Sequence, residues 1–284
     1  MDRRLRFGVS TPGGAYGIEE VAAVADAVGV RPELVLWYED FAAGPPVAEI
    51  AMVAAAQLTP VLTWEPRRWR TDVADGDAIM PGIAAGRHDE YLGAWADALA
   101  EVHTPLYLRF AHEFNGHWYP WSPAGGATPA DYVAAWRHVH DLFGRRGATA
   151  VRWIWSPDAG RHTEHPLADW YPGDDYVDVV GIDGYNWGTT LQWSAWASPG
   201  EIFEATVTQV RALTGKPMMI AEVGCAGEGG DKAHWIGEFV DWVSAQDDID
   251  AFIWFEHDKE TDWRVAGTPR YAAAMANALR EARR

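Results

Sequence analysis

Short apolar segments rich in Val, Ile, Leu, Trp and Tyr recur along the whole chain, and longer segments with helical periodicity separate them. There are eight such segments, as many as the strands of an α/β barrel. They cover residues 6–10, 34–38, 59–64, 105–111, 151–155, 177–182, 217–222 and 249–255. Because each is short and mostly apolar, we interpret them as buried parallel strands joined by right-handed helical crossovers.

Helix-start signals support this alternation of strands and helices. A hydroxyl residue followed by proline, the pattern of an N-cap and first helical turn, occurs at Thr128–Pro129, Ser198–Pro199 and Thr268–Pro269. No composition break suggests a linker, and the first strand is not followed by the G-x-G-x-x-G turn of a dinucleotide-binding sheet. We therefore predict an α/β fold, a single (β/α)8 TIM barrel, with residues 1–284 forming one catalytic domain.

The charge of the chain excludes several classes of partner. With 41 acidic and 23 basic residues, the formal net charge is -18, and such a field repels phosphate backbones and anionic membranes. We therefore expect no nucleic acid partner and no membrane partner. A neutral ligand such as an uncharged glycan is compatible with this charge. The sequence does not determine the oligomeric state, for which a monomer is the working expectation.

The cysteine content and the first residues bear on the cellular compartment. Cys225 is the only cysteine, which excludes an intrachain disulfide and a zinc site made of thiolates, and we expect it to be a small buried residue. The chain begins MDRRLRFGVS, without the apolar stretch of a secretory signal. Either the protein stays inside the cell or a signal has been trimmed from this chain.

The chain contains 17 tryptophans. Some of them must fill the core, but so many of them favour platforms on which flat-faced ligands stack. Sugar rings present such faces through their C–H groups. The tryptophans therefore point to a glycan ligand without identifying it.

Catalytic groups in a barrel of this kind lie at the C-terminal ends of the strands, and here most of those positions hold carboxylates. Taken singly, most are expected to be salt bridges or loop caps. The polar residues at these positions are Glu39, Asp40, Glu65, His112, Glu113, Asn115, Asp158, Asp183, Glu222, Glu256, His257 and Asp258.

Glu113 and Glu222 have surroundings that a purely structural carboxylate would not need. Glu113 lies in RFAHEFNGHWYPW, a dense cluster of polar and aromatic residues, and Glu222 ends the apolar run MMIAE. A carboxylate at the end of a buried strand costs desolvation unless the protein uses it. Glycoside cleavage uses two carboxyl groups, one protonated to donate to the leaving oxygen and one ionised to attack the anomeric carbon. The aromatic neighbours of Glu113 predict a raised pKa for this residue.

Two other hydrolytic chemistries have less support. His112 and His117 lack the H-E-x-x-H spacing of a metal-dependent hydrolase, and His138 and His140 would face different directions on a predicted helix. No G-x-S-x-G turn follows a strand, which disfavours acyl transfer by a serine. We therefore predict an enzyme with neither a catalytic metal nor a cofactor.

The segment RFAHEFNGHWYPW (109–121) resembles glycoside hydrolase family 26. Further segments look like the blocks of its lichenase-like branch: TWEP (63–66), IDGYNWGTT (182–190), KPMMIAEVG (216–224) and WFEHDKETDWR (254–264). The resemblance covers most of the chain and implies a clan A barrel. It also implies Glu113 as the acid/base and Glu222 as the nucleophile, in agreement with the choice made from the residues alone.

The same resemblance implies a set of substrate-site residues. They are Trp64, Arg109, His112, Asn115, Trp118, Asp183, Tyr185, Trp187 and Trp254. Within the set, Arg109 and Asp183 would support the catalytic groups, His112 and Tyr185 would line the subsite of the cleaved sugar, and Trp254 would form its floor. The other tryptophans would be neighbouring platforms.

The resemblance leaves the polysaccharide open. Mannan-cleaving members tend to follow the His-Glu motif with Trp-Phe-Trp-Trp, where this chain has the segment 118–121, Trp-Tyr-Pro-Trp, which favours β-1,3-1,4-glucan (lichenan). After Glu222 the chain reads Val-Gly-Cys in place of the Phe-Ala-Ser of the lichenase-like pattern, which could reshape the pocket. We therefore expect a retaining endo-β-glycanase acting on lichenan, secreted with its signal trimmed. The alternatives are an endo-β-1,4-mannanase of the same family and, more distantly, a non-catalytic glycan-binding barrel.

Overall fold

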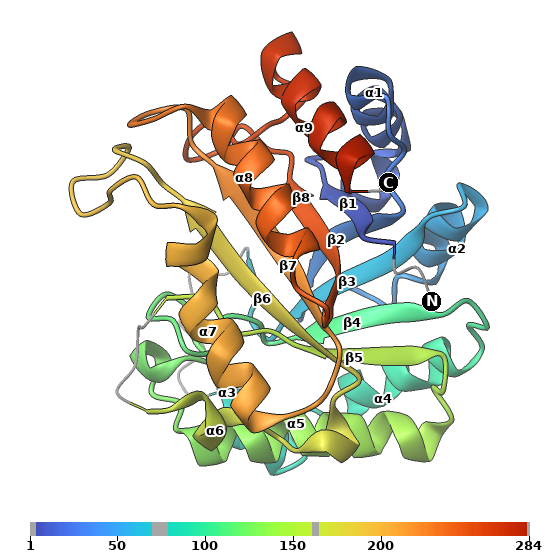
Figure 1. Cartoon of the computed structure of the whole chain (residues 1–284). Helices are drawn as coiled ribbons and strands as arrows, with labels where there is room; N and C mark the ends of the chain where they lie inside the picture. The colour runs from blue at the N-terminus through green and yellow to red at the C-terminus, as the bar shows by residue number, and fades with distance from the viewer. Residues whose placement is uncertain (1–3, 70–78, 161–164, 283–284) are drawn as a thin grey trace.

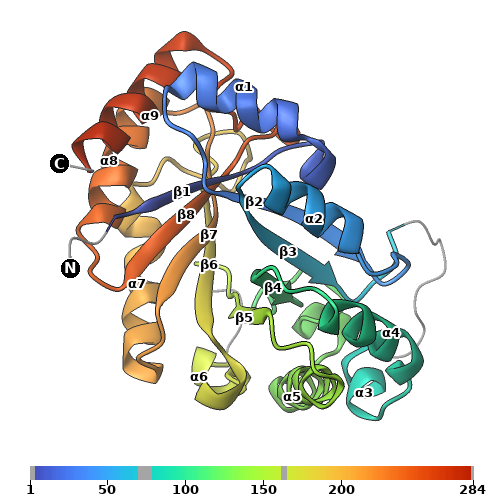
Figure 2. The same ribbon diagram turned by 90° about the vertical axis from the view of Figure 1, so that its right-hand side faces the viewer.

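The computed structural model describes residues 4–69, 79–160 and 165–282. These residues form a closed barrel of eight parallel strands in which each strand pairs with the next in sequence and β8 pairs with β1 (Figures 1 and 2). The strands are β1 (Arg6–Ser10), β2 (Leu34–Asp40), β3 (Thr59–Glu65), β4 (Leu106–Phe110), β5 (Val151–Trp155), β6 (Val179–Asn186), β7 (Met218–Cys225) and β8 (Ile249–Phe255). The predicted (β/α)8 TIM barrel is confirmed.

Helices surround the strands on the outside of the barrel, as Figure 2 shows. They are α1 (Ile18–Val28), α2 (Val47–Ala55), α3 (Ile79–Ala84), α4 (Asp89–Ala100), α5 (Pro129–Arg146), α6 (Leu167–Trp170), α7 (Pro199–Leu213), α8 (Lys232–Ser244) and α9 (Pro269–Glu281). The three predicted helix starts are confirmed, because Thr128, Ser198 and Thr268 are N-caps whose side chains accept backbone hydrogen bonds. Among the described residues, no helix is both long and apolar enough to span a bilayer.

Strand side chains alternate between the barrel interior and the layer under the helices. In β3, Val61 belongs to the inner apolar cluster, whereas Leu62 and Trp64 belong to the outer one. The same alternation places Ile253 of β8 inside and Trp254 outside. A buried tryptophan on a strand can therefore lie outside the barrel, under the helices, and have no access to the barrel mouth.

Four strands run further than the sequence predicts, β2 and β3 by one or two residues and β6 and β7 by three or four. The expected strands at 177–182 and 217–222 continue to Asn186 and Cys225, because β6 and β7 stay paired up to these two residues. The register between them shifts at Ile182/Asp183, and Asp183 then lies opposite Glu222. As a result Glu222 is held inside a paired strand instead of at its frayed end, and Tyr185 follows on the neighbouring strand.

Candidate active site

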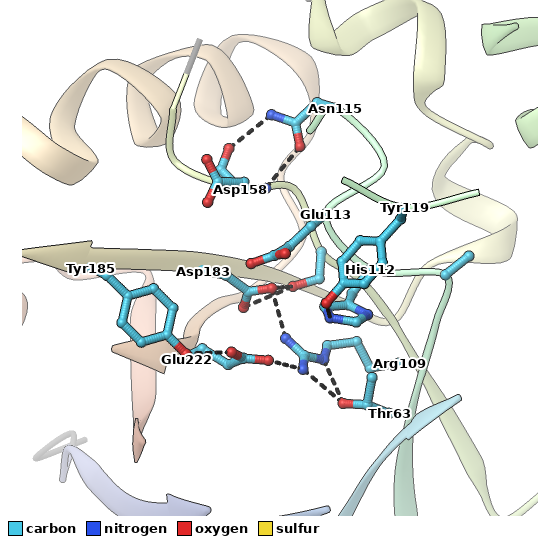
Figure 3. Close-up of polar contacts among 12 residues, drawn as sticks. Thr63, Arg109, His112, Glu113, Asn115, Tyr119, Asp158, Asp183, Tyr185 and Glu222 are labelled. Atoms are coloured by element: carbon cyan, nitrogen blue, oxygen red, sulfur yellow. Dashed lines mark hydrogen bonds and ion pairs between the residues drawn. The ribbon is translucent and has the colours of Figure 1, made fainter. Parts of the chain in front are cut away.

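A cleft of about 1760 Å³ opens at the C-terminal ends of the strands, and both carboxylates singled out from the sequence line it. Glu113 follows β4 and Glu222 lies on β7, so the two approach the cleft from well-separated strands of the ring (Figure 3). The cleft is also lined by Tyr38, Glu65, His112, Asn115, Trp118, Tyr119, Asp158, Tyr185, Trp187, Phe255, His257 and Trp263, among others. In barrels of this class ligands bind at this end.

The backbone around Glu113 adopts an unfavourable conformation. Ala111 and Glu113 have φ values of 46° and 50°, in the left-handed region that residues with a Cβ rarely adopt. Hydrogen bonds hold the segment there: the N–H of Glu113 donates to the carbonyl of Ser156 at 2.7 Å, and the indole N–H of Trp121 donates to the carbonyl of His112 at 2.6 Å. Such strain costs on the order of 1–3 kcal/mol per residue and is often found at functional sites.

The carboxyl group of Glu113 is buried in a carboxylate-rich setting. Only 7% of the residue is exposed. Burial raises the pKa of Glu113 well above its ordinary value, and the nearby charges of Asp158, Asp183 and Glu222 raise it further. The indole N–H of Trp118 donates to Glu113 Oε2 at 2.6 Å and opposes this shift. Glu113 is therefore a carboxyl group that keeps its proton at a pH where an ordinary glutamate has lost it.

The carboxylate of Glu222 lies in the opposite electrostatic setting. Burial alone would raise its pKa, but the charge of Arg109 and hydrogen bonds from Tyr185 and Arg109 hold the pKa of Glu222 below its ordinary value. The hydroxyl of Tyr185 donates to Glu222 Oε2 at 2.5 Å, and Arg109 forms an ion pair with Oε1. At a pH between the two pKa values, Glu222 is therefore ionised while Glu113 keeps its proton.

Arg109 is the centre of the network below these two groups. Its guanidinium pairs with Asp183 at 2.7 Å as well as with Glu222, and it donates to the hydroxyl of Thr63 at 2.7 and 2.9 Å (Figure 3). Both Arg109 and Asp183 are fully buried. The structure therefore corrects their assignment as substrate-binding residues: they support Glu222 from below, as the resemblance implied, and do not line the cleft surface.

His112 and Asn115 flank Glu113 in different ways. The Nε2 atom of His112 lies 3.1 Å from the hydroxyl of Tyr119, and burial, reinforced by the charge of Arg109, lowers the pKa of His112 well below its ordinary value. His112 is therefore neutral and lines the cleft. The side chain of Asn115 lines it too, but its amide is bound to the backbone of Asp158. The amide nitrogen donates to the carbonyl of Asp158 at 2.9 Å, and the amide oxygen accepts from the N–H of Asp158 at 2.8 Å. Asn115 therefore fixes the loop after β5.

Two predicted sugar platforms lie outside the cleft. Trp64 is fully buried against Trp95, with ring centroids 4.3 Å apart, and Trp254 is fully buried with its indole N–H on the carbonyl of Trp263 at 2.9 Å. Both interpretations are wrong for the same reason: these strand positions face the helices. The alternation of β8 could have shown this, because the next residue, Phe255, faces the cleft.

The remaining predicted aromatic residues do line the cleft. Trp118 is 41% exposed and holds Glu113, and Trp187 lies 6.1 Å from Tyr185 and 4.8 Å from Trp263 between ring centroids. Sequence reasoning missed Trp263, although it shares with Trp118 the signal of an aromatic residue in a polar loop. It also missed Tyr38, whose side chain faces Glu222 from β2.

Other strand-end carboxylates have the structural roles expected of most of them. Asp40 accepts a hydrogen bond from the backbone N–H of Ala42 at 2.9 Å, and Glu256 accepts from the N–H groups of Val265 and Ala266 at 2.8 Å. Within the described residues, no group of three or more His, Cys, Asp or Glu side chains is arranged to hold a metal ion. The site thus combines one carboxyl group of raised pKa and one of lowered pKa in a cleft lined by aromatic rings.

Comparison with known proteins relates the sequence of this chain to one family. The sequence profile of glycosyl hydrolase family 26 matches residues 86–225. Endoglucanase H of Acetivibrio thermocellus is 36% identical over 255 residues, 87% of this chain and 27% of that protein, and a mannan endo-1,4-β-mannosidase of Bacillus subtilis is 32% identical over 112 residues, 36% of this chain and 30% of that one. The chain therefore spans less than a third of these curated relatives. A β-mannanase structure from Bacteroides ovatus covers 99% of this chain and 90% of its own, with a TM-score of 0.70 and 18% identity, and shares the fold.

Proposed function

The chain belongs to glycoside hydrolase family 26, and from this premise we propose that it is a retaining endo-glycanase that cleaves a neutral β-linked polysaccharide. The observation that carries the proposal is that two carboxyl groups in one cleft have opposite surroundings, Glu113 among other carboxylates and Glu222 on Arg109 and Tyr185. These surroundings favour a protonated Glu113 and an ionised Glu222, the pair of states that double displacement needs at the start of the reaction. We also propose that the described barrel acts as one catalytic domain.

In the first step, Glu222 attacks the anomeric carbon while the bond from that carbon to the leaving oxygen breaks. Glu113 gives its proton to that oxygen, so the shortened chain leaves as an alcohol and Glu222 becomes a glycosyl ester. Arg109 and Tyr185 keep Glu222 ionised and oriented before attack. The aromatic rings of Trp187 and Trp263 would pack against the faces of the bound sugars.

In the second step, water replaces the leaving group. Formation of the ester removes the negative charge of Glu222, which is one of the charges that raise the pKa of Glu113. The pKa of Glu113 therefore falls, and its carboxylate can take a proton from the attacking water. The ester bond to Glu222 then breaks, and the sugar is released with its original anomeric configuration.

For the substrate, the names of the relatives favour the mannanase alternative over lichenan. Mannan endo-1,4-β-mannosidases recur among the curated relatives, and among the solved structures several are mannanases. We therefore propose β-1,4-mannan as the first candidate. A mixed-linkage glucan is the second, because the match to endoglucanase H extends over 87% of this chain. Because a polysaccharide does not cross a membrane unaided, we propose that the protein acts outside the cell.

A panel of soluble polysaccharides tests the proposal. The protein is incubated with galactomannan, glucomannan, lichenan and barley β-glucan, and the anomeric configuration of the first products is followed by proton NMR. We expect β-configured products from galactomannan and glucomannan. Release only from lichenan and barley glucan would move the assignment to the second candidate. First products of α configuration would overturn the retaining mechanism, and no release from any polysaccharide would overturn the enzymatic assignment.

A further inference from the structure

The exposed tryptophans of this protein share one location. Among the described residues, three tryptophans are exposed, Trp69 at 50%, Trp118 at 41% and Trp193 at 75%, and all three line the cleft. Exposure of so large an apolar side chain is unfavourable in water, and exposed apolar surface that gathers at one place marks a binding site. Trp118 is explained by its hydrogen bond to Glu113. Trp193, the most exposed of the three, has no part in the chemistry proposed above.

Trp193 is the outer member of a row of rings that begins at the catalytic centre. The hydroxyl of Tyr185 donates to Glu222, the ring of Trp187 lies 6.1 Å from that of Tyr185, and the ring of Trp193 lies 6.0 Å from that of Trp187. These residues come from the end of β6 and the loop that follows it. The row therefore leads from Glu222 toward the rim of the cleft along one side.

The turn that carries Trp193 is fixed by its own hydrogen bonds. The hydroxyl of Ser194 accepts from the N–H of Leu191 and donates to the carbonyl of Leu191, both at 3.1 Å, and the N–H of Ser194 bonds the same carbonyl. The loop is tied to the loop after β7 by the N–H of Thr189, which donates to the carbonyl of Glu228 at 3.2 Å. Because this turn is already ordered, its backbone loses little conformational entropy when a ligand binds to Trp193.

The position of this turn matters for a polymeric ligand. Trp69 follows β3 and Trp193 follows β6, and in a closed ring of eight strands these two strands lie on nearly opposite sides of the mouth. The two carboxyl groups of Glu113 and Glu222 belong to β4 and β7. The cleft thus extends toward an aromatic residue on each of two facing sides. A polysaccharide that is cut internally needs such a cleft, because its sugars must bind on both sides of the cleaved bond.

We propose that Trp193 is a stacking platform for a sugar unit distant from the cleaved bond, on the side of the cleft bounded by β6. The assignment rests on the proposed glycanase function and goes beyond it, because it names a residue that recognises chain length. A sugar of a β-linked glycan stacks its C–H face on the indole, and Trp187 lies between this platform and the sugar at the catalytic centre. Trp193 therefore contributes to the binding of long chains and little to that of short ones.

The test compares long and short substrates in the Trp193→Ala variant. Hydrolysis of the manno- and gluco-hexasaccharides and of an aryl disaccharide is measured, and binding of the same hexasaccharides is measured by calorimetry in a Glu222→Ala background. We expect KM and the dissociation constant for the cleaved hexasaccharide to rise about tenfold. The loss in kcat/KM should be at least fivefold larger for the hexasaccharide than for the aryl disaccharide. Trp193→Phe keeps a smaller aromatic ring, so its KM and dissociation constant for the hexasaccharide should lie between those of Trp193→Ala and the wild type.

Leu191→Ala is the matched control, because Leu191 is 37% exposed on the same turn but does not line the cleft. It should leave the preference between long and short substrates at the wild-type value. Equal losses on both substrates, or an unchanged hexasaccharide affinity in Trp193→Ala, would overturn the platform while leaving the glycanase function intact. If the wild-type protein hydrolyses no glycan and the Glu222→Ala variant binds no hexasaccharide, the proposed function fails and the platform fails with it.

Discussion

The two carboxyl groups of the site differ in how the barrel holds them. Glu222 lies within a paired strand, next to a shift in its register, and its oxygens meet the guanidinium of Arg109 and the hydroxyl of Tyr185. Glu113 lies beyond the end of its strand, in a left-handed backbone conformation, with other carboxylates as its charged neighbours. Strand pairing with a buried cation thus produces a stable anion, and a strained loop among anions produces an acid. One fold supplies both states within one cleft.

The largest test of this contrast removes the anion. Glu222→Ala should lower kcat by more than about 10⁴-fold, as loss of a nucleophile does in other hydrolases, because the variant lacks the carboxylate that forms the ester. The measurement is steady-state hydrolysis of the preferred polysaccharide, with circular dichroism to confirm folding. Added azide should restore turnover of an aryl glycoside and yield the α-glycosyl azide, since it fills the space left by the carboxylate.

Glu39→Gln is the control for this variant, because Glu39 is also a strand-end carboxylate but does not line the cleft. It should retain wild-type activity. Near wild-type hydrolysis by Glu222→Ala would show that the nucleophile has been assigned to the wrong strand.

A smaller and more selective effect is expected from removing the acid. Glu113→Gln should lower kcat on polysaccharide by about 10²–10⁴-fold, the usual contribution of general acid–base catalysis. An aryl glycoside with an acidic phenol needs no protonation of its leaving group, so its first step should proceed while the second step slows. Stopped-flow measurements should then show a burst of phenol followed by slow turnover. Equal losses on both substrates, without a burst, would argue against the acid role of Glu113.

The part of this contrast that depends on strand position could be predicted from the sequence. Buried strands end in recognisable polar residues, so the sequence predicts that Glu113 and Glu222 lie at the mouth of the barrel, where the structure places them. The identities of the platforms were harder, because Trp64 and Trp254 differ from the residues that face the cleft only by one step of strand alternation. The left-handed backbone at Ala111 and Glu113 could not be predicted, since it arises from hydrogen bonds to distant residues such as Tyr132 and Ser156.

A smaller effect is expected from removing the hydrogen bond that Tyr185 donates to Glu222. In Tyr185→Phe, Glu222 loses a hydrogen bond that favours its charged form, so its pKa should rise. The acid limb of the pH profile of kcat/KM reports the ionisation of the nucleophile and should therefore move to higher pH. Activity at the optimum should fall about tenfold, from the loss of a hydrogen bond to a charged group. The matched control is Tyr119→Phe, whose hydroxyl meets His112 instead of Glu222. A shift of the acid limb in Tyr119→Phe, or none in Tyr185→Phe, would contradict the assignment.

The smallest expected effect concerns stability, and here the two carboxyl groups should have opposite signs. Because the pKa of Glu113 is raised in the folded state, the folded protein binds its proton more tightly than the unfolded chain does. Stability is therefore lost as the pH rises from the ordinary value of a glutamate toward the folded pKa, and Glu113→Gln should remove this loss. The melting temperature of Glu113→Gln should equal that of the wild type near pH 4 and exceed it at neutral pH. The difference should be about 2–4 °C for each kcal/mol of unfolding free energy that the variant no longer loses. The pKa of Glu222 is lowered in the folded state, so its ionised form stabilises the protein at any pH above the ordinary pKa of a glutamate. Glu222→Gln should therefore lower the melting temperature at neutral pH. Thermal unfolding of the two variants followed from pH 4 to pH 8 measures both differences. Parallel curves for the two variants would show that the barrel does not divide the site into an acid side and an anion side.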